Sequence, residues 1–186
     1  AYVVHHLYKE DQAQILDILE ECKKAGNPDM VFEFCSTSKV SFPGSGIAAV
    51  AASKANLEDF RSYMQIQTIG HDKLNQLRHV KFFKNIDGLH EHMRKHANII
   101  RPKFELVLDI LNKELGGLGI GQWTTPKGGY FISFDSMKGC AKNIVAKAKE
   151  AGVVMTGAGA TYPYGKDPED SNIRICLLYT SDAADE

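Results

Sequence analysis

Apolar positions change their spacing along the chain, and each spacing predicts a type of element. Short apolar, β-prone runs predict buried strands at residues 30–35 and 47–52, and a further strand at residues 1–8. Between them, apolar residues that share one helical face predict a helix that Asp11 caps and Gly26 ends. This order of strands and helices is typical of an α/β domain.

Helical spacing dominates the middle of the chain. Asn56 and Asp72 are predicted to cap two helices that end near residues 67 and 83. A long helical segment is predicted to begin at Asp87 and to end at the glycine pair 116–117. We expect a kink where this segment passes Pro102, because proline removes a helical hydrogen bond.

The last part of the chain alternates between strands and a helix. Strands are predicted at residues 122–125, 130–134, 153–155 and 172–175, and a helix at residues 140–151. We therefore divide the chain into residues 1–85, the end of an α/β domain, and residues 86–175, a smaller αβ domain on a long helix.

Composition and charge narrow the possible partners. Hydrophobic residues make up 44% of the chain, enough for a core, but no apolar run approaches the roughly 20 residues of a membrane span. A formal net charge of −1 provides no positive field for nucleic acid. Four cysteines without a CxxC pair indicate reduced thiols. We expect a cytoplasmic protein with neither a membrane nor nucleic acid as partner.

The final eleven residues, 176–186, lack the periodicity of the rest of the chain. Their sequence is the translation of a transposon-end adapter that is common in sequencing libraries. We therefore expect this segment not to be native. Because the chain also opens without Met inside an apolar run, we expect residues 1–175 to be an internal piece of a longer protein.

The richest local chemistry lies after the first of the predicted internal strands. Three hydroxyl residues, Ser36, Thr37 and Ser38, are followed directly by Lys39. A lysine that leaves a buried strand end is partly desolvated, which makes its amine nucleophilic and suits a Schiff base with a carbonyl. The hydroxyls could donate to a phosphate. A solvated lysine on a turn remains the alternative from these residues alone.

Arg174 lies among apolar residues of a predicted strand. A guanidinium in such a strand needs an anionic partner. That partner is either an Asp or Glu of the protein or a substrate carboxylate that is held by two parallel hydrogen bonds. The residues themselves leave both alternatives open.

Two other motifs are predicted to have no chemistry. The segment 44–49 fits G-x-G-x-x-A, but a strand rather than a helix is predicted to follow it, which argues against a dinucleotide site. His92 and His96 lie four residues apart on the predicted long helix and lack a third ligand. We interpret them as a surface pair and expect no metal site.

Several short motifs occur together in a fixed order. They are Ala-Tyr at 1–2 with His-His-Leu-Tyr at 5–8, Ser-Thr-Ser-Lys at 36–39 with Gly-Ser-Gly at 44–46, Gln-Thr-Ile-Gly at 67–70, Pro-Lys-Gly-Gly-Tyr-Phe at 126–131, and Tyr-Pro-Tyr-Gly-Lys-Asp-Pro at 162–168 with Ser-Asn-Ile-Arg at 171–174. This set resembles the fold-type I pyridoxal-phosphate (PLP) aminotransferases, most closely the type Ic aspartate aminotransferases.

The resemblance implies a fold, a reaction and residue roles. Residues 1–85 would be the end of the PLP-binding large domain, and residues 86–175 the small C-terminal domain. The enzyme would transfer an amino group between an amino acid, such as aspartate or another dicarboxylate, and a 2-oxo acid. Lys39 would form the Schiff base, Tyr2 would contact the phenolic oxygen of PLP, Ser36 and Ser38 its phosphate, and Arg174 the substrate carboxylate. The family also implies a homodimer.

The chain departs from the family pattern at two points, and two other functions remain as alternatives. Many relatives have a phosphate-binding arginine where this chain has Ile47. The acid that pairs with the pyridine nitrogen would precede Ala1, so we expect this chain alone to be inactive. A transcription regulator with an aminotransferase-like effector domain and a β-eliminating PLP lyase are the alternatives. Lys39 and Arg174 would serve both PLP reactions, so they do not discriminate between them.

Overall fold

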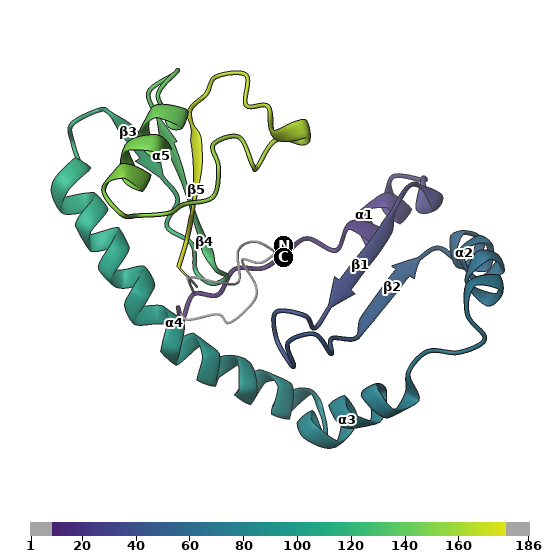
Figure 1. Ribbon diagram of the computed structural model, residues 1–186. Helices are drawn as coiled ribbons and strands as arrows, with labels where there is room; N and C mark the ends of the chain where they lie inside the picture. The colour runs from purple at the N-terminus through teal and green to yellow at the C-terminus, as the bar shows by residue number, and fades with distance from the viewer. Residues whose placement is uncertain (1–8, 178–186) are drawn as a thin grey trace. The chain divides into compact units, whose positions relative to one another are not determined.

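A computed structural model describes residues 9–177, which form two compact units (Figure 1). The first unit is Gln14–Met93. The second joins the described residues that precede Gln14 to the chain from Arg94 onward. The strand predicted at residues 1–8 and the segment 178–186 lie outside the described residues.

The first unit contains a two-stranded antiparallel ribbon and several helices. Phe32 of one strand lies opposite Ala52 of the other, and Ser36 lies opposite Ala48. Its elements are α1 (Ile18–Lys24), a 3-10 turn (Pro28–Met30), β1 (Phe32–Ser36), β2 (Ala48–Ala52), α2 (Lys54–Gln67), α3 (Lys73–Phe83) and the start of α4 (Ile86–Leu115). Both predicted strands and three of the predicted helices are confirmed in position to within a few residues, apart from the start of α1.

The helix caps show where local sequence decides an end. Asp72 caps α3 as predicted, and its Oδ1 accepts a hydrogen bond from Asn75 N at 2.9 Å. The cap predicted at Asp11 is wrong, because Asp17 begins α1 and accepts from the amide of Glu20. Asn56 is also not a cap. Ser53 caps α2, and the Asn56 side chain instead donates to the carbonyl of Asp29 at 2.9 Å.

The ribbon strands are exposed within the described residues, which contradicts the prediction of buried strands. All five residues of β1 are exposed, and Phe34 retains 67% of its accessible surface. A ribbon of two strands gives each strand only one neighbour and leaves both faces with little to pack against. The apolar runs therefore predicted the strands correctly but not their burial.

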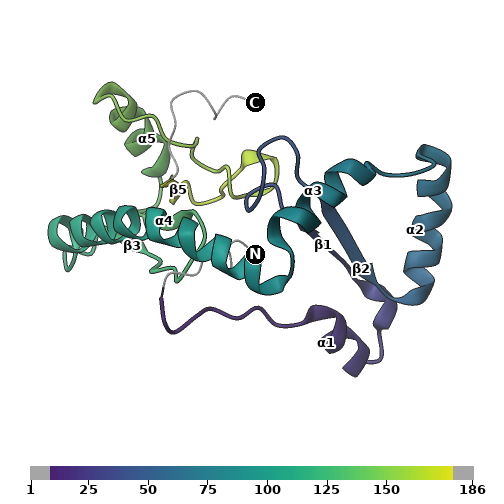
Figure 2. The same cartoon turned by 90° about the horizontal axis from the view of Figure 1, so that it is seen from below.

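The second unit is a three-stranded antiparallel sheet with the part of α4 from Arg94 onward packed along it (Figures 1 and 2). Its strands are β3 (Gly121–Trp123), β4 (Phe131–Ser136) and β5 (Asn172–Cys176), in the order β3-β4-β5, and α5 is Ala141–Glu150. The strand predicted at residues 153–155 is wrong. A turn at Ala151 and Gly152 ends α5, the amide of Val153 donates back to the carbonyl of Ala148, and residues 153–157 are irregular.

The core of the second unit lies between α4 and one face of the sheet. On α4, the buried residues follow helical spacing, and the helix continues through Pro102 to Leu115. On β4, Ile132 and Phe134 point into the core, so Phe131 and Ser133 face the other side of the sheet. The largest core cluster is Ala97, Ile100, Phe104, Leu108, Tyr130, Ile132 and Leu177.

The end of β5 does not coincide with the boundary predicted after residue 175. Cys176 pairs with Phe131 in the sheet, and Leu177 is buried and donates its amide to the Tyr130 carbonyl at 3.1 Å. Cys176 and Leu177 are therefore part of the folded unit. The origin of the remaining residues, 178–186, stays a prediction. Within residues 9–177, no helix has the length and apolar character required to cross a membrane.

Candidate active site

Lys39 lies on a tight turn that follows β1. The carbonyl of Thr37 accepts hydrogen bonds from the amides of Val40 at 2.9 Å and Ser41 at 2.8 Å, and these bonds close the turn around the lysine. The residue is exposed in its unit. The structure therefore places the lysine on an exposed turn, and the desolvation expected at a buried strand end is not seen among the described residues.

Two of the three hydroxyl groups before Lys39, those of Ser36 and Ser38, lie on the surface, whereas that of Thr37 does not. Ser36 Oγ and Ser38 Oγ lie 2.5 Å apart, and the Ser38 amide donates to Ser36 Oγ at 3.1 Å. Both serines are exposed, as is Lys39, which directly follows Ser38 in the chain. Hydroxyl and ammonium donors on one turn suit an anion such as a phosphate. Tyr2 lies outside the described residues.

Thr37 points its hydroxyl inward and joins the two ends of the loop 37–47. Its backbone N–H donates to the carbonyl of Ile47 at 2.9 Å, and its Oγ1 accepts from the Ile47 amide at 2.9 Å. Ile47, where the resemblance leads us to expect an arginine, therefore acts through its backbone. Gly46 approaches closely as well, since a Cβ there would lie 3.1 Å from both Cα and N of Ser38.

Helix α3 holds this loop through a buried histidine. His79 is only 3% exposed, and its Nδ1 lies 2.9 Å from the carbonyl of Asn75, to which it must donate. That leaves Nε2 to accept from Ser41 Oγ at 2.7 Å. The side chain of Asn75 donates to the carbonyl of Ser45 at 2.9 Å. Sequence reasoning missed His79, and no signal distinguished it from the other histidines of the chain.

His92 holds the same loop from α4. Its Nε2 lies 2.8 Å from the carbonyl of Val40, and its ring contacts the rings of Phe82 and Phe83 edge-on. The interpretation of His92 as part of a surface pair is therefore wrong, because the ring is half-buried and hydrogen-bonded to the backbone. Across residues 9–177, no group of three or more possible ligands could hold a metal ion.

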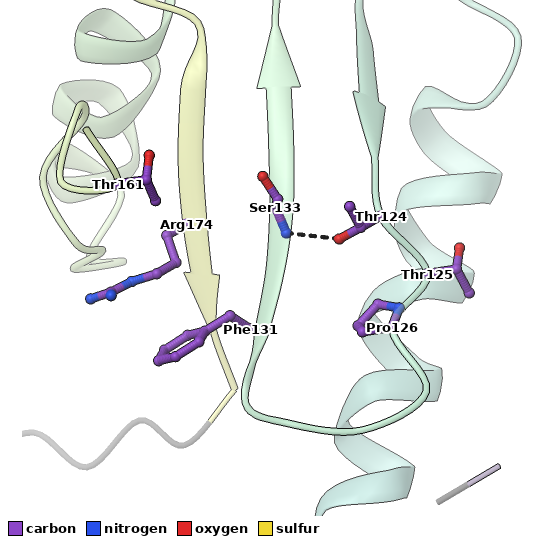
Figure 3. Close-up of a pocket in the computed structure, with 7 residues that line it drawn as sticks. All are labelled: Thr124, Thr125, Pro126, Phe131, Ser133, Thr161 and Arg174. Carbon is purple, nitrogen blue, oxygen red and sulfur yellow. Dashed lines mark hydrogen bonds between the residues drawn. The ribbon is translucent and has the colours of Figure 1, made fainter. Parts of the chain in front are cut away.

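Arg174 lies in the second unit, on the sheet face opposite the core (Figure 3). It pairs with Ser133 across the strands, and its guanidinium lies 4.5 Å from the centre of the Phe131 ring. Nη2 reaches Thr156 Oγ1 only at 3.5 Å, and the buried Nε has no hydrogen-bond partner in the structure. No carboxylate of residues 9–177 is paired with this guanidinium.

Arg174 forms one wall of a pocket of about 350 Å³. The pocket combines hydroxyl groups, apolar surface and this single cation, and its volume falls in the range of small-molecule sites. Figure 3 shows the seven residues around it, with the amide of Ser133 donating to Thr124 Oγ1 at 3.0 Å. The lining residues are Thr124, Thr125, Pro126, Phe131, Ser133, Thr161 and Arg174.

The segment that leads into β5 is fixed by Asp167. Its carboxylate accepts from the amides of Asn172 and Ser171, both at 2.8 Å, and of Glu169 at 3.0 Å. These hydrogen bonds, with those from Asn172 and Ser171 foremost, lower the pKa of Asp167 below its ordinary value. Sequence reasoning did not assign Asp167 a role.

The buried side chain of Asn172 continues this network into the pocket. Thr161 Oγ1 donates to its Oδ1 at 2.6 Å, and its Nδ2 donates to Ser133 Oγ at 2.9 Å. Two residues of the pocket wall are therefore connected through the first residue of β5.

The chain matches known proteins along most of its length. The family model described as aspartate amino-transferase matches residues 1–182. A protein of Mycolicibacterium smegmatis whose name assigns it to the aminotransferases is 45% identical over 181 residues, which are 97% of this chain and 42% of that protein. An aspartate aminotransferase of Corynebacterium glutamicum is 42% identical over 175 residues, 94% of this chain and 40% of that protein.

A solved structure agrees with these relatives. The crystal structure of an aspartate transaminase of Corynebacterium glutamicum matches with a TM-score of 0.88 and 41% identity, over 95% of this chain and 42% of that one. The chain therefore belongs to the aspartate amino-transferase family, a family of enzymes, and the predicted α/β class is confirmed. It spans about two fifths of the length of the curated relatives it matches.

Proposed function

We propose that the complete protein is a PLP-dependent aminotransferase that moves an amino group between an amino acid and a 2-oxo acid. The observation that carries this proposal is the guanidinium of Arg174. It faces a pocket of small-molecule size, it has no carboxylate partner among residues 9–177, and its buried Nε lacks a hydrogen bond. Buried donors without partners are rare and suggest a missing ligand. A substrate carboxylate supplies the anion that the site lacks.

The turn after β1 fits the cofactor. The hydroxyls of Ser36 and Ser38 would receive the phosphate oxygens, and the backbone of the loop would replace the arginine that many relatives have. The Lys39 amine would attach to the cofactor's aldehyde and later hold or move the proton at the substrate's α-carbon. When bound, PLP withdraws electrons from that carbon. Tyr2 would contact the phenolic oxygen, a role that rests on the resemblance alone.

Arg174 would orient the substrate. Nε and an Nη group of a guanidinium form a planar fork that matches both oxygens of a carboxylate. The Arg174 Cζ lies over the Phe131 ring, 4.5 Å from its centroid, so the ring limits how far the fork can move on that side. A carboxylate held in this way can turn only within limits, which keeps the α-hydrogen in a reactive orientation.

Further properties follow from the family rather than from the pocket. We propose aspartate or another dicarboxylate as the amino donor, supported by the aspartate aminotransferase of Corynebacterium glutamicum among the relatives. We also propose a homodimer. A cytoplasmic location is supported by the cysteines, since all four are free thiols. Residues 1–85 would then be the end of the PLP-binding large domain, and residues 86–175 would form the small C-terminal domain, whose last strand continues to Cys176.

The test uses the complete enzyme and the Lys39→Ala variant. We expect this change to abolish the visible absorbance of bound cofactor, its fixation to the lysine peptide by borohydride, and amino transfer. Lys54→Ala, which removes another exposed lysine of the same unit, should leave all three unchanged. Retained amino transfer in a Lys39→Ala protein free of wild-type enzyme would refute the assignment.

Product analysis separates the reaction classes. Amino transfer converts aspartate and a 2-oxo acid into oxaloacetate and a new amino acid, without release of ammonia. A β-eliminating lyase would release ammonia from its substrate, and a regulator domain would bind the cofactor without turnover. Either result with the wild-type protein would replace the aminotransferase proposal.

A further inference from the structure

We infer that His79 and His92 are positioning residues that hold the Lys39 turn from both flanks, an inference that rests on the role proposed above for Lys39. Both histidines, the turn, α3 and the start of α4 belong to the first unit. Neither imidazole is assigned to contact substrate or cofactor. They would act through the backbone on either side of the lysine.

His79 fixes one flank of the turn through Ser41. Because Nδ1 donates to the carbonyl of Asn75, the ring cannot rotate without breaking a helix-linked bond, and Nε2 faces the loop as an acceptor. Ser41 Oγ lies 2.7 Å from this nitrogen and 2.9 Å from Thr37 Oγ1. A buried ring thus connects both hydroxyls that flank the lysine turn to α3.

His92 fixes the residue that directly follows Lys39. Its Nε2 must donate to the carbonyl of Val40, because a carbonyl only accepts. The side chain of Val40 is itself buried, with 6% exposure. Val40 is therefore held by its amide, its carbonyl and its side chain, although Lys39 beside it is exposed.

Aromatic packing connects the two histidines. Phe42, in the same loop, contacts the His79 ring at 5.2 Å between centroids and the Phe82 ring at 5.0 Å. Phe82 in turn contacts the His92 ring at 5.2 Å. The histidines are thus parts of one packed cluster, so a ring that is lost on one flank loosens the other.

The consequence concerns the chemistry at Lys39 rather than binding of substrate. Displacing a reacting group by about 1 Å can lower the rate about 100-fold. A looser turn should therefore lower kcat for amino transfer by about 10- to 100-fold, with little change in KM. The cofactor should still attach, but more slowly.

Two pairs of substitutions isolate the hydrogen bonds. His79→Gln places an amide oxygen near the position of Nε2 and can still accept from Ser41, whereas His79→Asn reaches only the position of Nδ1. His92→Gln can still donate to the Val40 carbonyl, whereas His92→Phe keeps a ring but has no donor. In each pair we expect the Gln variant to keep the amide exchange rates and the kcat of the wild type. We expect the other variant to show faster exchange and a lower kcat. His90→Asn, an exposed histidine of α4, is the control.

The first readout does not need the cofactor. Amide hydrogen exchange of Val40, Ser41 and Ile47, all of which donate to Thr37, should accelerate about 10-fold or more in His79→Asn and His92→Phe. Exchange across β5 in the second unit should not change. Ser41→Ala and His79→Asn remove the same hydrogen bond. Amide exchange in the double variant should therefore be no faster than in the single variant with the faster exchange.

The outcomes separate this inference from the proposed function. If the wild-type enzyme does not attach PLP at Lys39, the proposed function fails. If it does, but each Gln variant matches its partner in exchange and in kcat, the hydrogen bonds have no role and the inference is overturned. Faster exchange with unchanged kcat and unchanged rate of cofactor fixation would overturn it as well, because the histidines would then stabilise the loop without positioning Lys39.

Discussion

The Lys39 turn and the Arg174 pocket differ in how the backbone that carries the functional residue is held in place. In the proposed function, each must hold a cationic side chain in a fixed direction. Lys39 lies on irregular backbone after an exposed ribbon, and the turn that carries it is hydrogen-bonded through Ser41 to the buried side chain of His79. Arg174 lies in the middle of a ladder whose other face is packed on a helix, so strand register sets its position.

This difference indicates where each site is vulnerable. A site on a strand above a core loses its geometry when the core is damaged, because the register depends on the packed face. A site on a turn loses its geometry when a few hydrogen bonds are removed, although the unit can remain folded. Substitutions in the two regions should therefore separate effects on chemistry from effects on stability.

The largest effect is expected at Arg174. Arg174→Ala should lower kcat/KM for amino acids by roughly 30- to several-thousand-fold, because losing one partner of a charge pair costs about 2–5 kcal/mol. The melting temperature should change little, since no carboxylate of the described residues is left unpaired. Arg174→Lys should recover only part of the loss, because an ammonium is not a planar fork.

Steady-state kinetics and thermal unfolding of the complete enzyme measure both quantities. Arg61→Ala, which removes an exposed arginine of α2, is the control. An Arg174→Ala enzyme that unfolds easily but binds substrate normally when folded would show that the arginine has a structural partner instead.

The second prediction concerns the core beneath the pocket. Ile132 is fully buried on the opposite face of β4 from Ser133 and Phe131. Ile132→Ala should reduce the free energy of unfolding by about 2–5 kcal/mol, from lost burial and the cavity left behind. Val153→Ala, at an exposed position, should stay within about 0.5 kcal/mol of wild type. Urea unfolding of the chain tests this, and equal effects of the two substitutions would contradict the described core.

Much of the fold was predictable because its signals are local. The Asp72 cap, the long helix α4 and the strand β4 each depend on nearby residues, and each lies close to its predicted place. The errors arose where a local signal competed with a contact. Asn is a residue type that often caps helices, but the Asn56 side chain donates a hydrogen bond to the Asp29 carbonyl instead. The apolar run 153–155 has no strand partner among residues 9–177.

The candidate site was predictable only in part. Lys39 and Arg174 stood out because their residue types are unusual beside apolar strands. His79 and His92 did not, because their roles depend on contacts with residues 38 and 52 positions away, which no spacing along the chain reveals. The roles of Lys39, Ser36, Ser38 and Arg174 remain predictions, and Tyr2 lies outside the described residues.

The third prediction concerns the close approach of the loop to the turn. A Cβ at Gly46 would lie within 3.1 Å of the Ser38 backbone, too near for normal contact, although the backbone angles of Gly46 suit any residue. Gly46→Ala should therefore move the hydroxyl of Ser38 and weaken PLP binding by about 10-fold, which corresponds to about 1.4 kcal/mol.

Equilibrium binding of PLP to the apoenzyme measures this change. Gly70→Ala is the matched control, because a Cβ there meets nothing within 4 Å and the backbone is equally permissive. Equal PLP affinity of the two variants would mean that the Gly46 contact does not shape the phosphate site.

The smallest effect is expected at Asp167, and it depends on pH. Amides of Asn172 and Ser171 hold its pKa below the ordinary value of 3.8, so folding favours the ionised form. The resulting stability is present above the unfolded pKa and is lost as the pH falls through the folded pKa. Asp167→Asn should therefore lower the melting temperature at neutral pH, and the difference from wild type should shrink below about pH 4.

Thermal unfolding from pH 2 to 7 measures the difference, with Asp109→Asn, on the exposed side of α4, as control. A difference that grows toward low pH would mean that the Asp167 carboxylate does not stabilise the segment entering β5 through its ionised form.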